Sequence, residues 1–153
     1  MANMYSQVHL HFIFAPKYRQ ALIRPDWEIG LYKYITGIVE ARKHKMIAIN
    51  GMSDHLHMLV GFRTHQSIAD LMQDVKADSS QWINVNRFCA SRFEWQSGYG
   101  VFSYSKSQVP DVIRYIQTQK EHHRKMTFQE EYQAFLEKFE VKFDERYVFK
   151  MPE

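Results

Sequence analysis

The chain has 153 residues, 45% of them hydrophobic and 15% aromatic, which excludes a disordered protein and predicts one folded domain over residues 1–153. Its net charge of +3 permits a nucleic-acid partner without requiring one. The start lacks a signal-peptide pattern, and no apolar run approaches the ~20 residues that cross a bilayer, so we expect no membrane partner. The one cysteine, Cys89, excludes an internal disulfide and a multi-cysteine zinc site. Together these features lead us to expect a cytoplasmic protein.

The first half of the chain alternates between the strand and helix periods. Pro16 ends the first alternating segment, Pro25 stands where a first helical turn tolerates proline, and Ser67 is a suitable helix N-cap. These signals predict a strand over 5–15, a helix over 25–44, a short strand over 46–50, a turn over 51–54, a strand over 55–62 and a helix over 67–88.

The second half predicts one more sheet segment and two more helices. The aromatic segment 93–105 bends at two glycines and indicates a hairpin or a bulged strand. A helix is expected over 110–125, and a capping box at 127–130 starts another that runs to about residue 139. An apolar tail at 147–149 either adds a strand or docks on a partner. The whole pattern predicts an α+β fold, an antiparallel sheet with helices on one or both faces.

Two histidines in the strand over 55–62 are the first candidate functional residues. Successive strand side chains alternate between faces, so His55 and His57 share one face, about 7 Å apart, while the apolar residues between and after them form the other. Two imidazoles at this spacing can bind one metal ion. Most such pairs do no chemistry, so the pair needs support from elsewhere in the chain.

The helix over 110–125 supplies further candidates. Tyr115 and Gln119 are four residues apart and share a helix face, which His122 and His123 roughly continue. Taken alone, such a tyrosine is usually core and such a glutamine solvated. Together with the histidine pair, a glutamine oxygen gives a mixed, incomplete ligand set that suits Mg²⁺ or Mn²⁺ better than a closed zinc site. A tyrosine there is a weak nucleophile until it is deprotonated or faces a metal-polarised phosphate.

The ordered set of motifs resembles the single-tyrosine HUH transposases of the insertion-sequence-200/605 family. The HUH pattern matches Asp54-His-Leu-His57, and the tyrosine helix matches Tyr115-Ile-Gln-Thr-Gln119. Further likenesses are Val8-His-Leu-His-Phe-Ile-Phe14 followed by Lys17-Tyr-Arg19, then Val75-Lys-Ala-Asp-Ser-Ser80, then the aromatic run from Trp95 to Ser105. The resemblance covers nearly all of the chain, in the same order.

The resemblance implies a ferredoxin/RRM-like HUH fold that dimerises edge to edge and cuts single-stranded DNA beside terminal hairpins. Tyr115 would attack the phosphorus, giving a 5′-phosphotyrosine and a free 3′-hydroxyl that attacks another such link, with no nucleotide cofactor. His55, His57 and Gln119 would hold a divalent metal, Mg²⁺ or Mn²⁺. The tyrosine helix of such enzymes can complete the partner's site, so the resemblance leaves open whether Tyr115 acts in cis or in trans.

Contacts to DNA are predicted only as candidates, each of which is as often ordinary surface. Where relatives often carry glycine after the lysine of the second-helix segment, this chain has Ala77-Asp78, and the acidic Asp78 is expected to weaken a phosphate contact by Lys76. The basic residues that could face phosphates are Lys17, Arg19, Arg63, Lys76 and Lys106.

Three other functions remain open on the sequence. A domesticated protein that processes repeated hairpins would carry an identical site. A zinc or manganese hydrolase could use His55, His57, His122 and His123, although only Glu121 is near enough in sequence to serve as a base. A single-stranded nucleic-acid-binding module without catalysis would need little beyond the mild charge and the aromatic residues.

Overall fold

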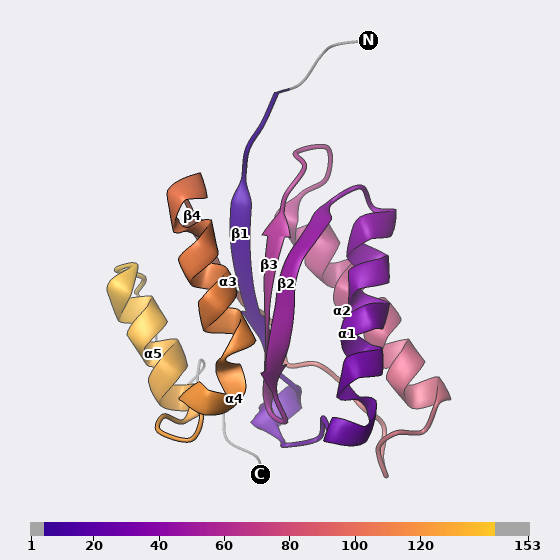
Figure 1. Ribbon diagram of the computed structural model, residues 1–153. Coiled ribbons are helices and arrows are strands. Elements are labelled where there is room, and N and C mark those ends of the chain that lie inside the picture. Colours follow the sequence, from indigo (N-terminus) through magenta and orange to yellow (C-terminus); the bar gives the residue numbers. More distant parts are fainter. Residues whose placement is uncertain (1–4, 143–153) are drawn as a thin grey trace.

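The computed structural model describes residues 5–142 as a four-stranded antiparallel sheet in the order β2-β3-β1-β4, which confirms the predicted α+β class. Helices α1 and α2 cover one face of the sheet, and α3, α4 and α5 lie on the other (Figure 1). The predicted tail at 147–149 lies outside the described residues. The elements are β1 (His9–Phe14), η1 (Lys17–Arg19), α1 (Pro25–Ala41), β2 (Lys45–Met52), β3 (His55–Gly61), α2 (Ile68–Val85), β4 (Gly100–Tyr104), η2 (Lys106–Gln108), α3 (Val109–Gln117), α4 (Gln119–His122) and α5 (Phe128–Lys138).

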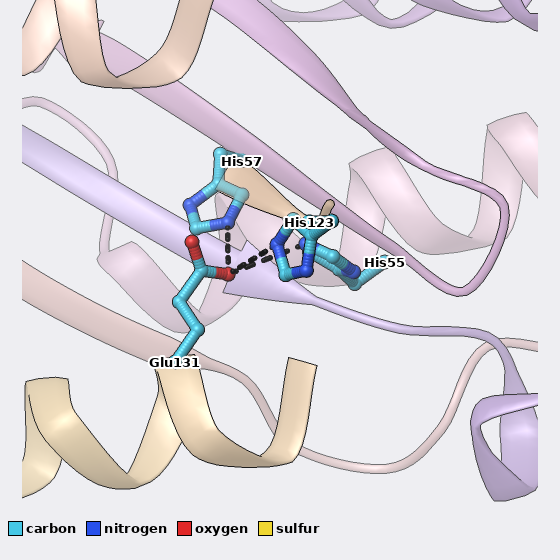
Figure 2. A group of neighbouring side chains, drawn as sticks. All are labelled: His55, His57, His123 and Glu131. Atoms are coloured by element: carbon cyan, nitrogen blue, oxygen red, sulfur yellow. Dashed lines mark hydrogen bonds and ion pairs between the residues drawn. The ribbon is translucent and has the colours of Figure 1, made fainter. Parts of the chain in front are cut away.

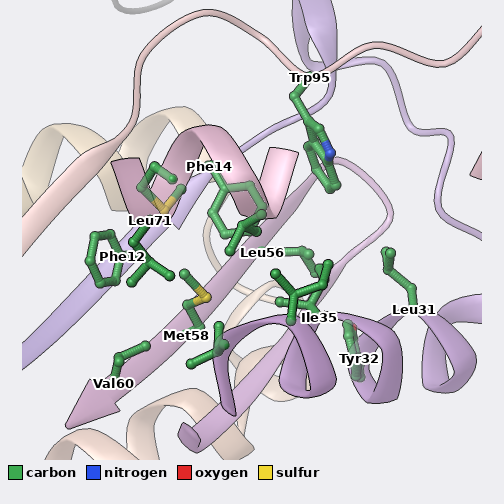
Figure 3. Close-up of a cluster of buried hydrophobic side chains, with 14 of the residues drawn as sticks. Phe12, Phe14, Leu31, Tyr32, Ile35, Leu56, Met58, Val60, Leu71 and Trp95 are labelled. Atoms are coloured by element: carbon green, nitrogen blue, oxygen red, sulfur yellow. The ribbon is translucent and has the colours of Figure 1, made fainter. Parts of the chain in front are cut away.

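The main core fills the space between the sheet and α1 and α2 (Figure 3). Alternation puts Phe12 of β1 and Met58 of β3 on this face, and both are fully buried. From the helices, Ile35 and Leu71 meet them. A buried hydrogen bond from Trp95 Nε1 to a hydroxyl of α2 attaches the segment before β4 to the same layer.

An ion-pair cluster joins α1 to α2 at the edge of this core. Arg42 Nε lies 2.7 Å from Asp74, and its Nη2 lies 3.1 Å from Asp78. Asp78 is therefore paired with an arginine, and Lys76 instead donates from Nζ to the backbone oxygens of Gln96 and Gly98. The departure from the family pattern at Asp78 has a structural role here, which the sequence comparison did not reveal.

The opposite face of the sheet packs against α3 and α5 in two smaller apolar clusters. Ile13 of β1 meets Phe128 and Leu136 of α5, and Leu59 of β3 meets Ile116 of α3. The strand residues that alternate with the main core, including His55 and His57, point into this second layer. The polar side chains of the site are thus enclosed between a sheet and two helices.

The β2–β3 hairpin brings its strands unusually close where the histidine strand begins. Gly51 pairs with Leu56, and a Cβ at Gly51 would lie 2.3 Å from the backbone oxygen of His55. Only glycine fits this approach. The hairpin thereby fixes the backbone that carries the first histidine.

Two sequence predictions were wrong in detail. Residues 93–105 contain one strand, β4 (Gly100–Tyr104), and before it an isolated bridge between Pro16 and Trp95, so the segment is not a hairpin. The helix expected over 110–125 breaks at Thr118 into α3 and α4. Asn50 Nδ2 from β2 donates to the backbone oxygens of Ile116 and Gln117, so a side chain of the sheet occupies carbonyls that would accept hydrogen bonds in a continuous helix.

Among the described residues, no helix is both long and apolar enough to cross a membrane.

Two isoleucines of α1 provide a matched test of the core. Ile35 is fully buried and Ile29 is 56% exposed. We expect Ile35→Ala to lower the free energy of unfolding by about 2–5 kcal/mol, because it leaves a cavity, and Ile29→Ala to change it by less than ~0.5 kcal/mol. Urea denaturation of both variants measures the difference, and equal losses would contradict the described packing of α1.

Candidate metal centre

The two histidines of β3 meet a carboxylate from α5. Figure 2 shows His55, His57 and His123 converging on Glu131. Oxygen Oε1 of Glu131 lies 2.9 Å from His57 Nε2, 3.1 Å from His123 Nε2 and 3.3 Å from His55 Nε2. Glu131 is 1% exposed and both strand histidines are fully buried. A buried carboxylate of this kind needs several partners, and three imidazoles supply them.

The tyrosine and glutamine of the predicted site reach the same carboxylate. Tyr115 donates its hydroxyl hydrogen bond to Glu131 Oε2, and Gln119 Nε2 donates to the same oxygen at 3.0 Å. Oxygen Oε1 of Gln119 lies 3.2 Å from His55 Nε2 and 3.1 Å from His123 Nε2. The break at Thr118 therefore does not separate them, and the structure brings all four sequence-predicted residues together within one chain.

A second set of hydrogen bonds fixes the outer nitrogens of the two strand histidines. Asp54 Oδ1 lies 2.7 Å from His55 Nδ1, and His11 Nε2 lies 2.7 Å from His57 Nδ1. Both rings consequently turn Nε2 toward the centre. Outer partners of this type orient metal-binding histidines and set their tautomers.

Burial and charge shift the pKa values of these groups in different directions. Burial lowers the pKa of His57 to about 4, so this imidazole is neutral near neutral pH. Burial also lowers the pKa of His55, but hydrogen bonds to Asp54 and Glu131 outweigh it and raise that pKa above 6.5. Burial opposes ionisation of Glu131, yet hydrogen bonds from the imidazoles hold its pKa well below its usual range.

The phenol of Tyr115 is protonated in this arrangement. Burial raises its pKa above the ordinary value of 10, and the charge of Glu131 and the hydrogen bond to it raise the pKa further. A phenol must lose its proton to act as a nucleophile. The Tyr115 phenol must therefore lose its proton to Glu131 or to another acceptor before it can attack.

The donor set fits a divalent cation. Ligand atoms from His55, His57, His123 and Glu131 all lie within 4.8 Å of one another, and the Gln119 oxygen is adjacent. Three imidazole nitrogens and a carboxylate suit Mn²⁺, Zn²⁺ or a similar transition metal better than Mg²⁺, which prefers oxygen ligands. Such an ion polarises phosphate oxygens and orients an attacking group.

Sequence reasoning missed Glu131 and placed His122 with His123. The structure separates these two histidines. His123 faces the carboxylate, whereas the His122 ring lies tilted against the Tyr115 ring, with centroids 4.5 Å apart. A signal for Glu131 was present: it lies three residues after Phe128 and four before Phe135, on the apolar stripe of α5. A carboxylate at such a position must find buried partners.

The candidate DNA-contacting residues lie at two ends of the sheet. Lys17 and Arg19 follow the end of β1, where His57 pairs with Ile13, so they lie at the same end as the histidines. Arg63 follows β3 and Lys106 follows β4, at the opposite end. Lys76 is half-buried, and burial lowers its pKa to about 8.

A cavity of about 480 Å³ adjoins the tyrosine between α3 and α5. Tyr115, Tyr104, His122 and Phe135 form aromatic parts of its wall, and Gln108 contributes an amide. Its size and its aromatic lining suit a planar group of nucleotide dimensions beside the phenol.

The combination of an HUH pair, a tyrosine and a glutamine around one carboxylate can be compared with known proteins. The family model described as "Transposase IS200 like" matches residues 4–119. The chain belongs to the IS200-like transposase family. The match ends at Gln119, so it includes the histidine pair and Tyr115 but not His123 or Glu131.

Individual relatives of this transposase are distant in sequence. The ISDra2 transposase TnpA of Deinococcus radiodurans is 23% identical over 119 residues, covering 74% of this chain and 84% of that protein. The transposase of insertion sequence IS200 from Salmonella typhimurium is 24% identical over 112 residues, covering 69% of this chain and 74% of that one.

Two solved structures share the fold. A Deinococcus radiodurans R1 protein assigned as a transposase has a TM-score of 0.63 at 21% identity, over 78% of this chain and 95% of that one. A REP-associated tyrosine transposase, solved with a REP hairpin bound, has a TM-score of 0.60 at 12% identity, over 80% and 73% of the two chains.

The buried histidines predict a loss of stability in mild acid. The folded-state pKa of His57, about 4, lies below the ordinary 6.5, so the unfolded chain binds a proton that the folded chain does not. Stability present above pH 6.5 is therefore lost as the pH falls, by about 2 kcal/mol at pH 5. Burial also lowers the pKa of His11, which therefore acts in the same direction. The raised pKa of His55 stabilises the folded chain instead, but this contribution is already fully present below pH 6.5 and does not grow as the pH falls further.

Urea unfolding at pH 6.5, 5.5 and 5.0 with a chelator present measures this dependence. A His57→Phe variant, which lacks the titrating group, serves as the comparison and should show a shallower slope. A wild-type stability that stays constant or rises over this range would contradict a neutral, buried His57.

Proposed function

We propose that this transposase cleaves and rejoins single-stranded DNA through Tyr115, at a metal centre formed by His55, His57, Gln119, His123 and Glu131. One observation carries the proposal: the phenol of Tyr115 and three imidazoles meet the two oxygens of one buried carboxylate. A nucleophile and a metal-binding set thus lie close enough to act on the same phosphodiester.

The proposed reaction is a transesterification. The Tyr115 oxygen forms a bond to phosphorus, the bond to the 3′ oxygen breaks, and the tyrosine proton is transferred to that oxygen, leaving a 5′-phosphotyrosine and a 3′-hydroxyl. A divalent ion would supply polarisation of the phosphate. Glu131 and Gln119 orient the phenol and the ligand side chains through their hydrogen bonds. The cavity beside Tyr115 provides space for a nucleotide next to the scissile phosphate.

The proposed substrate is a single strand next to a DNA hairpin. A structural neighbour is bound to a REP hairpin, and the sheet end that carries the histidines also carries Lys17 and Arg19. Contacts from Arg63, Lys76 and Lys106 remain candidates. Because one chain brings Tyr115 to its own histidines, the tyrosine is proposed to act in cis, and a homodimer would not be needed to complete the site.

A metal-dependent hydrolase is the second candidate. The third imidazole, from His123, favours it because three histidines and a carboxylate are typical of sites that activate water. In that reaction the tyrosine would only hold the carboxylate, so the fate of the cleaved DNA distinguishes the two functions.

Replacing the proposed nucleophile gives the sharpest test. We expect Tyr115→Phe to abolish the covalent adduct that forms in Mn²⁺ with 3′-labelled single-stranded DNA from the flanks of the gene, because the 5′-phosphotyrosine retains the 3′ fragment. Tyr99→Phe, in the aromatic segment before β4, should leave the adduct intact. Denaturing gels and peptide mapping detect the adduct. Continued adduct formation by the Phe variant would refute the assignment, and adduct-free cleavage in both variants would favour the hydrolase.

Two glutamates of α5 test the ligand set. Glu131→Gln exchanges the buried carboxylate for a neutral amide, so we expect Mn²⁺ to bind at least about tenfold more weakly. Glu137→Gln changes an exposed carboxylate of the same helix and should leave the affinity unchanged. Isothermal titration without DNA measures both, with Mg²⁺ expected to bind more weakly than Mn²⁺. Equal Mn²⁺ affinity of the two variants would show that Glu131 is not a ligand.

A further inference from the structure

A third histidine of the sheet, His11 in β1, lies behind the metal centre and is not one of its proposed ligands. It is fully buried, and its Nε2 lies 2.7 Å from Nδ1 of His57. In the β1–β3 ladder Ile13 pairs with His57, so His11 lies two residues along on the same face of the sheet. Because His11 contacts the outer edge of a proposed ligand, a role for it in metal binding rests on the proposed metal centre.

Aromatic rings lie close to His11, which also lines the cavity beside Tyr115. The centroid of Phe135 lies 5.2 Å away, edge-on, and those of Tyr104 and Tyr115 lie at 6.1 and 6.5 Å. Within residues 5–142, Nδ1 of His11 has no hydrogen-bond partner. The hydrogen bond to His57 is therefore the polar contact that determines where the ring proton of His11 lies.

The protonation pattern in this structure depends on the carboxylate. An ionised carboxylate only accepts hydrogen bonds, so His57 donates from Nε2 to Glu131 Oε1. A neutral His57 then has a bare Nδ1, which must accept. His11 accordingly donates from Nε2, and its Nδ1 is the bare nitrogen.

The opposite pattern is required when His57 Nε2 binds a cation. A metal-binding nitrogen offers its lone pair, so the proton of a neutral His57 must be on Nδ1. That nitrogen then donates to His11 Nε2, which accepts, and the proton of His11 is on Nδ1. Both rings stay neutral and carry two protons between them in either state, with donor and acceptor exchanged.

We propose that His11 is a positioning residue that serves both states, reversing its hydrogen bond so that His57 can present Nε2 either as a donor to Glu131 or as a ligand. Imidazole suits this role because its Nε2 is a donor in one tautomer and an acceptor in the other. The unpartnered Nδ1 permits the exchange, since a fixed partner there would lock one tautomer. A lysine or a carboxylate at this position would support one state alone.

The tautomers can be observed directly in the wild-type chain. Two-bond nitrogen–proton correlation spectra of protein with ¹⁵N-labelled histidine identify which ring nitrogen carries the proton. We expect Nε2–H on both His11 and His57 with chelator, and Nδ1–H on both with Zn²⁺, which is diamagnetic. If His11 keeps one tautomer in both samples, or if His57 already carries its proton on Nδ1 with chelator, the proposal is wrong.

Variants test the same point through binding. His11→Phe removes the partner of His57 Nδ1, and we expect Zn²⁺ to bind about 10–100-fold more weakly. His11→Gln, whose amide can turn to donate or to accept, should restore most of the affinity. His9 lies two residues before His11, on the same face of β1. His9→Phe is therefore the matched control and should bind Zn²⁺ as the wild type does.

Circular dichroism and urea unfolding accompany the titrations, so that a folding defect is distinguished from a loss of ligand orientation. A folded His11→Phe protein with wild-type Zn²⁺ affinity would overturn the proposal. That result would leave the Tyr115 adduct unaffected, whereas an absent adduct with an intact His11 effect would overturn the transposase reaction and keep the positioning role.

Discussion

The buried carboxylate of Glu131 is the constraint on which the second layer of this protein depends. An ionised carboxylate that is 1% exposed is costly unless it is paired, and here its two oxygens receive contacts from three imidazoles, a phenol and an amide. These groups come from β3, α3, α4 and the residue after α4, whereas the carboxylate itself belongs to α5. One charge therefore links four elements of the second layer, at the point where the proposed chemistry takes place.

The two faces of the sheet differ in composition: one packs the main apolar core and the other carries the candidate site. The face toward α1 and α2 is apolar along β1 and β3, with Phe12 and Met58 in a large core. The other face carries histidines at the positions that alternate with these residues, and its apolar clusters are small. Because a strand alternates strictly, the core on one side of β3 fixes the direction of the two strand ligands, His55 and His57, on the other. The orientation of these two histidines thus depends on packing on the opposite face of the sheet.

Much of the fold and part of the site could be predicted from the sequence. Period-two alternation placed β1 and β3 and the shared face of His55 and His57, and helix caps at Ser67 and Thr127 marked the starts of α2 and α5, where the structure shows both side chains accepting backbone hydrogen bonds. The resemblance added the roles expected of Tyr115 and Gln119. Contacts between distant segments could not be predicted in this way. The break at Thr118 depends on Asn50 from another element, and Glu131 becomes a site residue only once α5 packs on the sheet.

The position of Glu131 in the chain has a consequence for biosynthesis. The part of the chain that matches the family ends at residue 119, and α5 begins at Phe128. The sheet and its large core are thus translated first, and the carboxylate that contacts the histidines and the tyrosine leaves the ribosome after them. A nascent chain would fold its scaffold before the proposed site is complete. An unfinished copy would therefore carry the phenol and the strand imidazoles without the carboxylate that contacts them.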